Sequence, residues 1–121
     1  MSDIVKTEII DNVALLTLND PDRLNALSLD MIAELHKNII LINNGEIKAR
    51  CLVITGAGRG FCAGANLIEG AGKSSFEDID PGKALEEHYH PFLVDLKNLK
   101  IPLITAVNGV AAGAGCSLGI F

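Results

Sequence analysis

The sequence has no concentration of basic side chains. Ten lysine and arginine residues stand against fifteen aspartate and glutamate residues, which gives a formal net charge of −5. Nucleic acids and anionic membranes are bound through clusters of Lys and Arg, so neither is a favoured partner. The 49% hydrophobic and 21% charged residues are instead typical of a globular protein, and 121 residues suffice for one modest domain.

The chain is also poor in cysteine, with only Cys51, Cys62 and Cys116 and no CxxC pair. An odd number without metal-ligand spacing argues against a disulfide framework and against a zinc site, and it suits a reducing cytosol. We expect buried, inert thiols, because free cysteine mostly behaves as a small hydrophobic residue. The start, MSDIVKTEII, lacks the regions of a signal peptide, and no apolar run is long enough to span a bilayer. These absences predict a cytoplasmic protein.

The first third of the chain predicts a hairpin, a loop and a helix. Residues 4–18 hold two β-type runs separated by Asp11 and Asn12, which favour a tight turn between antiparallel strands. NDPDRLNAL, residues 19–27, is a loop. Ser28 is a good N-cap for a helix whose apolar residues recur at helical spacing, namely Leu29, Ile32, Leu35, Ile39 and Ile42.

The next part of the chain predicts a buried strand and a surface segment. Residues 43–45, Asn-Asn-Gly, end the helix, and CLVIT at 51–55 is a continuous apolar run of the kind found in strands buried on both faces. Small residues and a short helix follow. Residues 70–82, GAGKSSFEDIDPG, are polar and rich in glycine and predict a mobile surface segment.

The last third predicts a helix, a strand and a second helix. Residues 83–99 have helical periodicity, with Pro91 either as a kink or as the first residue of a shorter second helix. Residues 102–109 read as another buried strand, and residues 110–121 as the opening of a closely packed helix. That last segment has no cap or polar tail, which suggests a chain cut off within an element. Strands alternating with helices predict an α/β layered fold.

Several motifs resemble known sites without matching them. GAGRG at 56–60 has its third glycine one residue too early for the dinucleotide fingerprint GxGxxG. GAGKSS at 70–75 resembles the end of a P-loop, but Leu67 stands where the first glycine of that motif belongs. His88 and His90 form an HxH pair with no third ligand at a sensible spacing, so no metal site is expected.

Two similar stretches remain, each an apolar strand followed by small residues and a helix start. They are LVITGAGRGFCAGANL at 52–67 and LITAVNGVAAGAGCSL at 103–118. Small side chains let a ligand approach the backbone closely, and two such turns can aim two amide N–H groups at one oxygen, which is an oxyanion hole. The N-terminus of the second helix would add a favourable partial positive charge. The alternative is that both turns only pack strands tightly against helices.

These stretches carry a resemblance to a known family. GFCAGANL resembles the F-x-A-G-A-D-[LI] motif of the enoyl-CoA hydratase/isomerase (crotonase) superfamily, and PLITAVNGVAAGAGCSL resembles its K-P-x-I-A-x-[VI]-x-G-x-A-x-G-G-G-x-E-L motif. LNDPDRLNAL is similar to the family's early N-R-P-x-x-x-N-A-[LF] segment, and all three occur in the family's order. Within the superfamily, the chain most resembles the epoxyphenylacetyl-CoA isomerases of aerobic phenylacetate breakdown. The resemblance implies a crotonase-like fold of repeated ββα units, with residues 1–121 as the N-terminal part of one acyl-CoA-binding domain.

The resemblance also implies a site. The backbone N–H groups of Ala65 and Ala114 would form the oxyanion hole that stabilises the enolate of an acyl-CoA thioester. Arg23 or Lys73 would sit near the CoA phosphates. No cofactor or metal is implied beyond the coenzyme A of the substrate, and the family assembles as trimers or pairs of trimers. The residues that would line the CoA and pantetheine channel are Asn25, Ala26, Leu27, Ala63, Asn66, Leu67 and Ile68.

This chain departs from the family pattern in three respects, and the first of them argues against hydration. Hydratases carry a glutamate where this chain has Ser117, so one of the two carboxylates that activate water is missing. Asn66 replaces a common aspartate and can still cap the following turn. The acidic residue that the family places further along lies beyond Phe121. The resemblance thus favours an enzyme that moves a double bond or opens a ring oxide.

Two other functions compete with this interpretation. The chain could be an inactive fragment that binds acyl-CoA weakly or associates with full-length subunits through exposed apolar surface. A nucleotide-binding domain fails on motif spacing, and protection by ATP or NAD would revive it.

Overall fold

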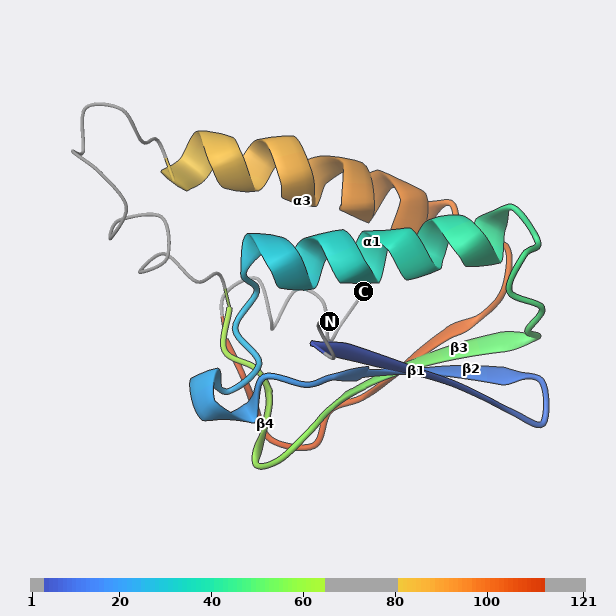
Figure 1. Cartoon of the computed structure of the whole chain (residues 1–121), viewed down its shortest axis with the longest axis horizontal. Helices are drawn as coiled ribbons and strands as arrows, with labels where there is room; N and C mark the ends of the chain where they lie inside the picture. The colour runs from blue at the N-terminus through green and yellow to red at the C-terminus, as the bar shows by residue number, and fades with distance from the viewer. Residues whose placement is uncertain (1–3, 65–80, 113–121) are drawn as a thin grey trace.

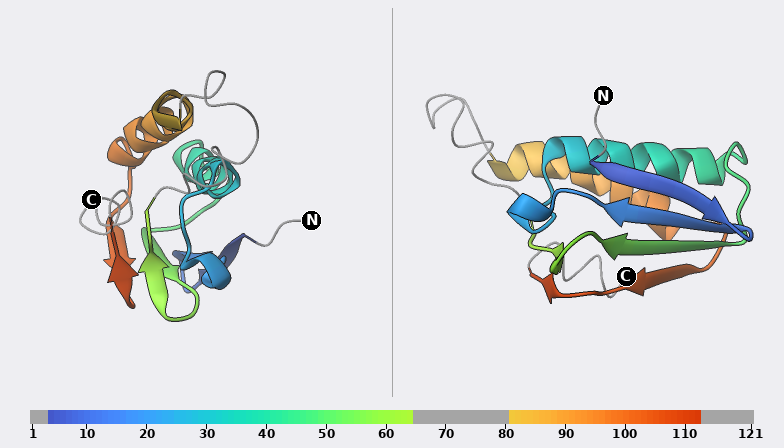
Figure 2. Two further views of the ribbon diagram at one scale, coloured as in Figure 1. Left: turned by 90° about the vertical axis from the view of Figure 1, so that its left-hand side faces the viewer. Right: turned by 60° about the horizontal axis from the view of Figure 1, so that its bottom comes forward.

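The structure, a computed structural model, describes residues 4–64 and 81–112 and is an α/β assembly, as predicted. One sheet of four strands has the order β1-β2-β3-β5, and the helices α1 and α3 lie together over one of its faces (Figures 1 and 2). A second sheet contains β4 and β6. The bounds of the strands are Val5–Ile10 for β1, Val13–Leu18 for β2, Cys51–Gly56 for β3, Gly60–Cys62 for β4, Leu103–Ala106 for β5 and Val110–Ala111 for β6.

The predicted hairpin is confirmed, and its turn has the expected chemistry. The strands β1 and β2 pair antiparallel, with Ile10 opposite Val13. Asp11 and Asn12 both have positive φ, at 49° and 68°, which Asn and Asp tolerate better than other side chains. Two such residues in a two-residue connection match the twist of the flanking strands.

Helix α1, Leu29–Asn43, begins and ends where the sequence predicts. The Ser28 hydroxyl accepts a hydrogen bond from the Met31 N–H at 3.1 Å, which satisfies one of the free donors of the first turn. Four of the five predicted apolar positions are buried, but Leu29, the first residue of the helix, is 41% exposed. The buried face of α1 consists of Met31, Ile32, Leu35, Asn38, Ile39 and Ile42.

Helix α3, Pro81–Lys97, passes through Pro91 as one helix, so neither a separate second helix nor a start at residue 83 is correct (Figure 1). Pro91 is exposed, where its missing N–H costs least. Pro81 and Gly82, expected in the surface segment, belong to this helix. The rest of that segment and the short helix before it lie outside the described residues.

The core lies between the helices and one face of the sheet. In β2 and β3, alternate residues point to this face, and the fully buried ones are Ala14, Leu16, Leu18, Leu52 and Ile54. Phe92 and Leu96 of α3 join them. The prediction that 51–55 is buried on both faces is wrong for the second face, where Cys51, Val53 and Thr55 keep partial exposure.

Strand β5 is an edge strand and not a buried one, which corrects the prediction for residues 102–109. Ile104 is 54% exposed, because β3 is the one described strand that pairs with β5 and the described helices cover only the opposite face.

Two short strands differ from what the sequence predicts. The sequence predicts a small-residue loop at 60–62 and the start of a helix at 110–111, but these residues form β4 and β6, which pair in parallel. Strands of three and two residues show no periodicity by which a sequence pattern could identify them. Residues 113–121 of the expected helix lie outside the described part of the chain.

Candidate active site

The two small-residue stretches of the sequence meet at the β4–β6 pair. Cys62 is in register with Ala111, and the Ala112 N–H donates to the Cys62 carbonyl at 3.1 Å. In a parallel pair the carboxyl ends of both strands lie at the same edge. Both stretches therefore run side by side up to the last described residues. The predicted oxyanion donors, Ala65 and Ala114, follow these strands and lie outside the described residues.

The loop that carries the first predicted channel residues packs against the end of β4. The Ala63 N–H donates to the Leu24 carbonyl at 3.0 Å, and the Leu27 N–H donates to the Gly64 carbonyl at 2.6 Å. Ala26 and Ala63 are partly exposed, whereas Leu27 is buried. The structure thus brings together the four described members of the predicted channel lining, Asn25, Ala26, Leu27 and Ala63. Asn66, Leu67 and Ile68 are outside the described residues.

Asn25 is the buried polar centre of this loop. Its amide oxygen accepts from the Asp20 N–H at 2.7 Å, and its amide nitrogen donates to the carbonyls of Ala57 and Gly60 at 3.0 and 2.8 Å. The side chain is fully buried, and the residue has a φ of 57°. Its amide is therefore committed to the backbone around it and shapes the site from beneath.

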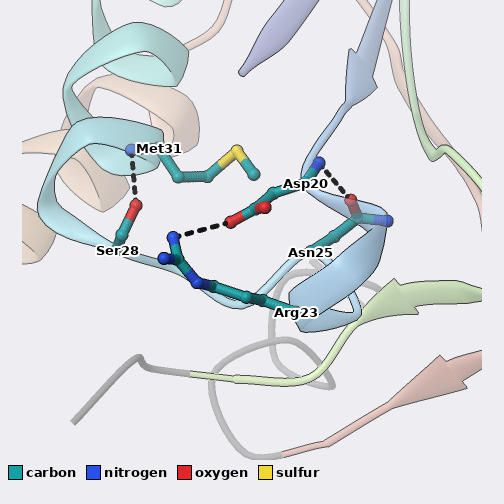
Figure 3. A network of polar contacts seen from close by, with 5 residues as sticks. All are labelled: Asp20, Arg23, Asn25, Ser28 and Met31. Atoms are coloured by element: carbon teal, nitrogen blue, oxygen red, sulfur yellow. Dashed lines mark hydrogen bonds and ion pairs between the residues drawn. The ribbon is translucent and has the colours of Figure 1, made fainter. Parts of the chain in front are cut away.

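The loop around Asn25 also holds an arginine near the protein surface. The short helix η1, Pro21–Arg23, interrupts the predicted loop, and Arg23 is 3.5 Å from the Asp20 carboxylate (Figure 3). The Arg23 side chain is 64% exposed, so its guanidinium can also meet an anion from solvent. The other predicted phosphate contact, Lys73, lies outside the described residues.

Glycines let the backbone segments around β4 approach closely. A Cβ on Gly109 would lie 2.0 Å from the Arg59 carbonyl oxygen, and one on Gly56 would lie 2.5 Å from the Gly60 carbonyl oxygen. Gly58 has a φ of 77°, which glycine adopts without strain. Gly56 and Gly109 thus allow close packing of backbone on backbone next to β4. The alternative expected from the sequence was packing of strands against helices, and these two contacts are not of that kind.

Cys62 and Tyr89 lie near each other beside β4 and stay neutral at physiological pH. Burial raises the pKa of the Cys62 thiol, and a backbone hydrogen bond with Gly64 lowers it by less. Burial also raises the pKa of Tyr89, and the neighbouring Cys62 adds to the rise. A buried neutral thiol is a poor nucleophile, as expected for Cys62. Cys51 is only partly buried, which corrects the expectation for that residue, and Cys116 is outside the described part.

No metal centre emerges from the described residues. His88 and His90 are exposed, and no three His, Cys, Asp or Glu side chains gather in residues 4–64 and 81–112. Over the same ranges, no helix combines the length and hydropathy that crossing a membrane requires.

Sequence reasoning missed Asn108. This exposed residue follows β5, and its side chain contacts Thr55, Gly56, Gly58 and Gly60 across the β3–β4 turn. An asparagine next to a glycine at a strand end was the available signal, since such residues often bond to nearby backbone.

Known proteins resemble the chain over nearly its whole length. It is 39% identical over 120 residues to the 1,2-epoxyphenylacetyl-CoA isomerase of Escherichia coli, which covers 99% of this chain and 45% of the relative. A probable enoyl-CoA hydratase of Rhodobacter capsulatus is 36% identical, covering 96% and 42%. The chain thus spans less than half the length of these relatives.

Solved structures agree with this likeness. An enoyl-CoA hydratase from Bacillus anthracis superposes with a TM-score of 0.83 at 30% identity, over 97% of this chain and 44% of that one. One from Mycobacterium smegmatis gives 0.84 at 31% identity, over 95% and 44%. The expected crotonase-like fold is therefore confirmed. The enoyl-CoA hydratase/isomerase family model matches residues 8–121, and the chain belongs to that family.

Proposed function

We propose that this chain forms the oxyanion and acyl-CoA-binding part of an enzyme that stabilises a thioester enolate. The parallel pairing of β4 with β6 is the observation that carries the proposal. Ala65 follows Cys62 by three residues, and Ala114 follows its register partner Ala111 by the same three. Because both residues follow this register pair at equal spacing, we expect their N–H groups to lie close enough to share one oxygen.

Two N–H groups on the thioester oxygen would lower the energy of the enolate as its charge develops. Removing one such donor costs about 10²- to 10³-fold in kcat in other enzymes. Ala114 occupies a position where the family often has glycine, and only its N–H is required. In the proposal, residues 1–121 are the N-terminal part of one domain, and the proton-transferring carboxylate comes from beyond Phe121.

We favour isomerisation over hydration as the overall reaction. Ser117 leaves no carboxylate at the position where hydratases carry glutamate, so water activation by a carboxylate pair is not available from this segment. An isomerase needs one carboxylate to shuttle a proton, which is compatible with this sequence. The isomerase of Escherichia coli named above is consistent with this choice but does not decide it, because hydratases are nearly as similar.

The remaining parts of the proposal concern binding. Ala26, Leu27 and Ala63 would line the CoA and pantetheine channel, with Asn25 supporting them, and Asn66, Leu67 and Ile68 would continue it. Arg23 or Lys73 would meet the phosphates of CoA. The reaction would need no cofactor or metal besides the CoA of its substrate. We further propose that the protein is cytoplasmic and assembles as a homo-oligomer, either a trimer or a hexamer.

A thermal melt followed by far-ultraviolet circular dichroism tests the ligand class. The purified chain is melted alone and with excess acetoacetyl-CoA, NAD or ATP. A ligand that binds only the folded state raises its stability by RT ln(1 + [L]/Kd), or about 2.7 kcal/mol at a hundredfold excess over Kd. We expect a shift with acetoacetyl-CoA alone. A cooperative melt moved by none of them, or by NAD or ATP, would contradict the proposal.

The exposed apolar residues favour one alternative, a non-catalytic segment that associates with full-length subunits. Ile104, Val107 and Val110 are each at least half exposed. Sedimentation velocity separates the two functions. A chain that binds no acyl-CoA but joins a full-length homologue into a larger species would support the alternative.

A further inference from the structure

We propose that Asn108 is a positioning residue that fixes the spacing between the two strands leading to the oxyanion donors. The inference rests on the proposed function, because it assigns Asn108 a role in that same site. Asn108 lies outside the proposed channel and oxyanion hole, yet the alignment of the hole would depend on its side chain.

The amide of Asn108 contacts the β3–β4 turn at both of its ends. Its oxygen accepts from the Gly56 N–H at 3.0 Å and lies 3.5 Å from the Thr55 hydroxyl. Its nitrogen donates to the carbonyls of Gly58 at 3.1 Å and Gly60 at 3.3 Å. One side chain thus bridges the end of β3 and the first residue of β4.

The same turn is held from its other side by Asn25. Both amides donate to the Gly60 carbonyl, Asn25 at 2.8 Å and Asn108 at 3.3 Å. Gly60 is the residue from which β4 starts. The two asparagines differ in environment, since Asn25 is fully buried and Asn108 is exposed.

The position of Asn108 in the chain makes this contact a link between the two donor strands. Its backbone is two residues before Val110, where β6 begins, while its side chain holds the turn that leads into β4. Next to it, Gly109 packs directly on the Arg59 carbonyl. The Asn108 side chain therefore links the start of β6 to the start of β4. Loss of this contact would let the two strands shift relative to each other, and the residues that follow both strands would shift with them.

Because Asn108 is exposed, its role in positioning the strands can be distinguished from a role in folding stability. Loss of an exposed side chain removes no core packing, and water can replace its hydrogen bonds. Loss of alignment is more damaging, because a misplacement of about 1 Å in a catalytic site can cost about 10²-fold in rate. We therefore expect Asn108 substitutions to weaken polarisation of the substrate carbonyl far more than they weaken folding.

The test uses the CoA thioester of para-dimethylaminocinnamate, whose absorption moves to longer wavelength when its thioester oxygen accepts hydrogen bonds. The shift is measured at saturation for the chain and for Asn108→Ala, together with Kd and the thermal midpoint. Asn44→Ala is the matched control, because Asn44 is also exposed and its amide oxygen also accepts from a backbone N–H, that of Glu46, at 2.9 Å. Asn108→Asp, a second variant, keeps the acceptor and removes the donors.

We expect both Asn108 variants to lose most of the red shift, with Kd changed by less than about tenfold. Amide exchange at residues 60–63 should become severalfold faster, and Asn44→Ala should match the parent chain. A parent chain without any red shift would count against the proposed function, and this inference would fall with it. A parental shift that Asn108→Ala retains would overturn the role of Asn108 alone. Loss of cooperative melting in both Asn108 variants would also overturn it, since the residue would then hold the fold.

Discussion

Two asparagine side chains, Asn25 and Asn108, form hydrogen bonds to the backbone around the candidate site. The turn at residues 56–60 connects two strands, and its backbone carbonyls and N–H groups need hydrogen-bond partners from side chains or water. Asn25 and Asn108 supply them from opposite sides. A planar amide with one acceptor and two donor hydrogens suits this task, because a single side chain can hold both kinds of backbone group.

Replacing Asn25 should destabilise the fold. The Asn25→Ala variant leaves the carbonyls of Ala57 and Gly60 without this donor and the Asp20 N–H without its acceptor. We expect a loss of about 2 kcal/mol or more in the free energy of unfolding, measured by urea denaturation. Asn44→Ala is the exposed control and should lose less than about 1 kcal/mol. Equal losses in the two variants would contradict the structural role of Asn25.

Gly109 should tolerate no side chain. In Gly109→Ala the new Cβ would meet the Arg59 carbonyl oxygen at 2.0 Å, so the backbone has to move. We expect a cost of about 3 kcal/mol. Gly45→Ala is the matched control, because Gly45 has a φ of 85° but nothing within 4 Å of its Cβ position. Backbone strain alone should cost about 1 kcal/mol there. If Gly109→Ala costs no more than Gly45→Ala in thermal or urea unfolding, the close approach is wrong.

Cys62 and Tyr89 should make the fold less stable in alkali. The pKa of each is raised by burial in the folded chain above its ordinary value of 9.0 or 10.0. Below about pH 9 both states hold these protons, and above it the unfolded chain releases them first, so the free energy of unfolding falls. Urea denaturation at about pH 8 and about pH 10.5 measures the fall. In Cys62→Ala the free energy of unfolding should decrease less between these two pH values. A decrease as large as in the parent chain would show that Cys62 does not contribute to it.

At the scale of elements, α1 and α3 are joined by both polar and apolar contacts. His36 Nε2 and Asp95 Oδ2 lie 2.5 Å apart, and the Asn43 amide donates to the Asp95 carbonyl at 3.1 Å. Phe92 packs edge-on against the His36 ring, with centroids 6.1 Å apart. The polar pair is partly exposed and worth little by itself, so Phe92 should dominate this helix contact.

Phe92→Ala should therefore be among the most damaging changes in α3. The side chain is fully buried, and its removal leaves a cavity between the helices and the sheet. We expect a loss of about 3 to 5 kcal/mol. Val94→Ala, on the same helix but 42% exposed, should change stability by about 0.5 kcal/mol or less. Similar unfolding midpoints for both variants in urea would show that α3 does not pack on the core as described.

Elements that depend on local backbone preferences could be predicted from the sequence, whereas strands that depend on pairing with a distant segment could not. The Asp11-Asn12 turn and the Ser28 cap are local backbone preferences, so the hairpin and α1 were predicted correctly. Strands β4 and β6 exist because each pairs with the other, far away in sequence. The same holds for the candidate site. Its motifs could be identified in the sequence, but the Asn108 contacts could not, because they join residues about 50 positions apart.

At the scale of the whole molecule, the described helices α1 and α3 cover only one face of the main sheet (Figure 1). Residues of the central strands that point away from α1 and α3, such as Leu15 and Val53, keep partial exposure, and Ile10 and Ile104 are more than half exposed. No described element covers this face. An apolar face of this kind is expected to favour self-association, whatever the catalytic role of the chain.

Amide exchange should show whether the sheet and helices form one cooperative unit. Strands β2 and β3 are each paired on both sides, and their alternate residues are fully buried, whereas β1 and β5 are edges. Exchange through unfolding of the whole core should therefore give Leu16 and Ile54 the slowest amides, and the exposed residues of β1 should exchange much faster. The rates are measured by NMR or by mass spectrometry of short peptides, and a low urea concentration should speed the slowest amides most. Uniformly fast exchange would mean that the segment needs further chain or a partner to complete its core. In that case the losses expected for Asn25→Ala and Phe92→Ala would be measurable only in that larger assembly.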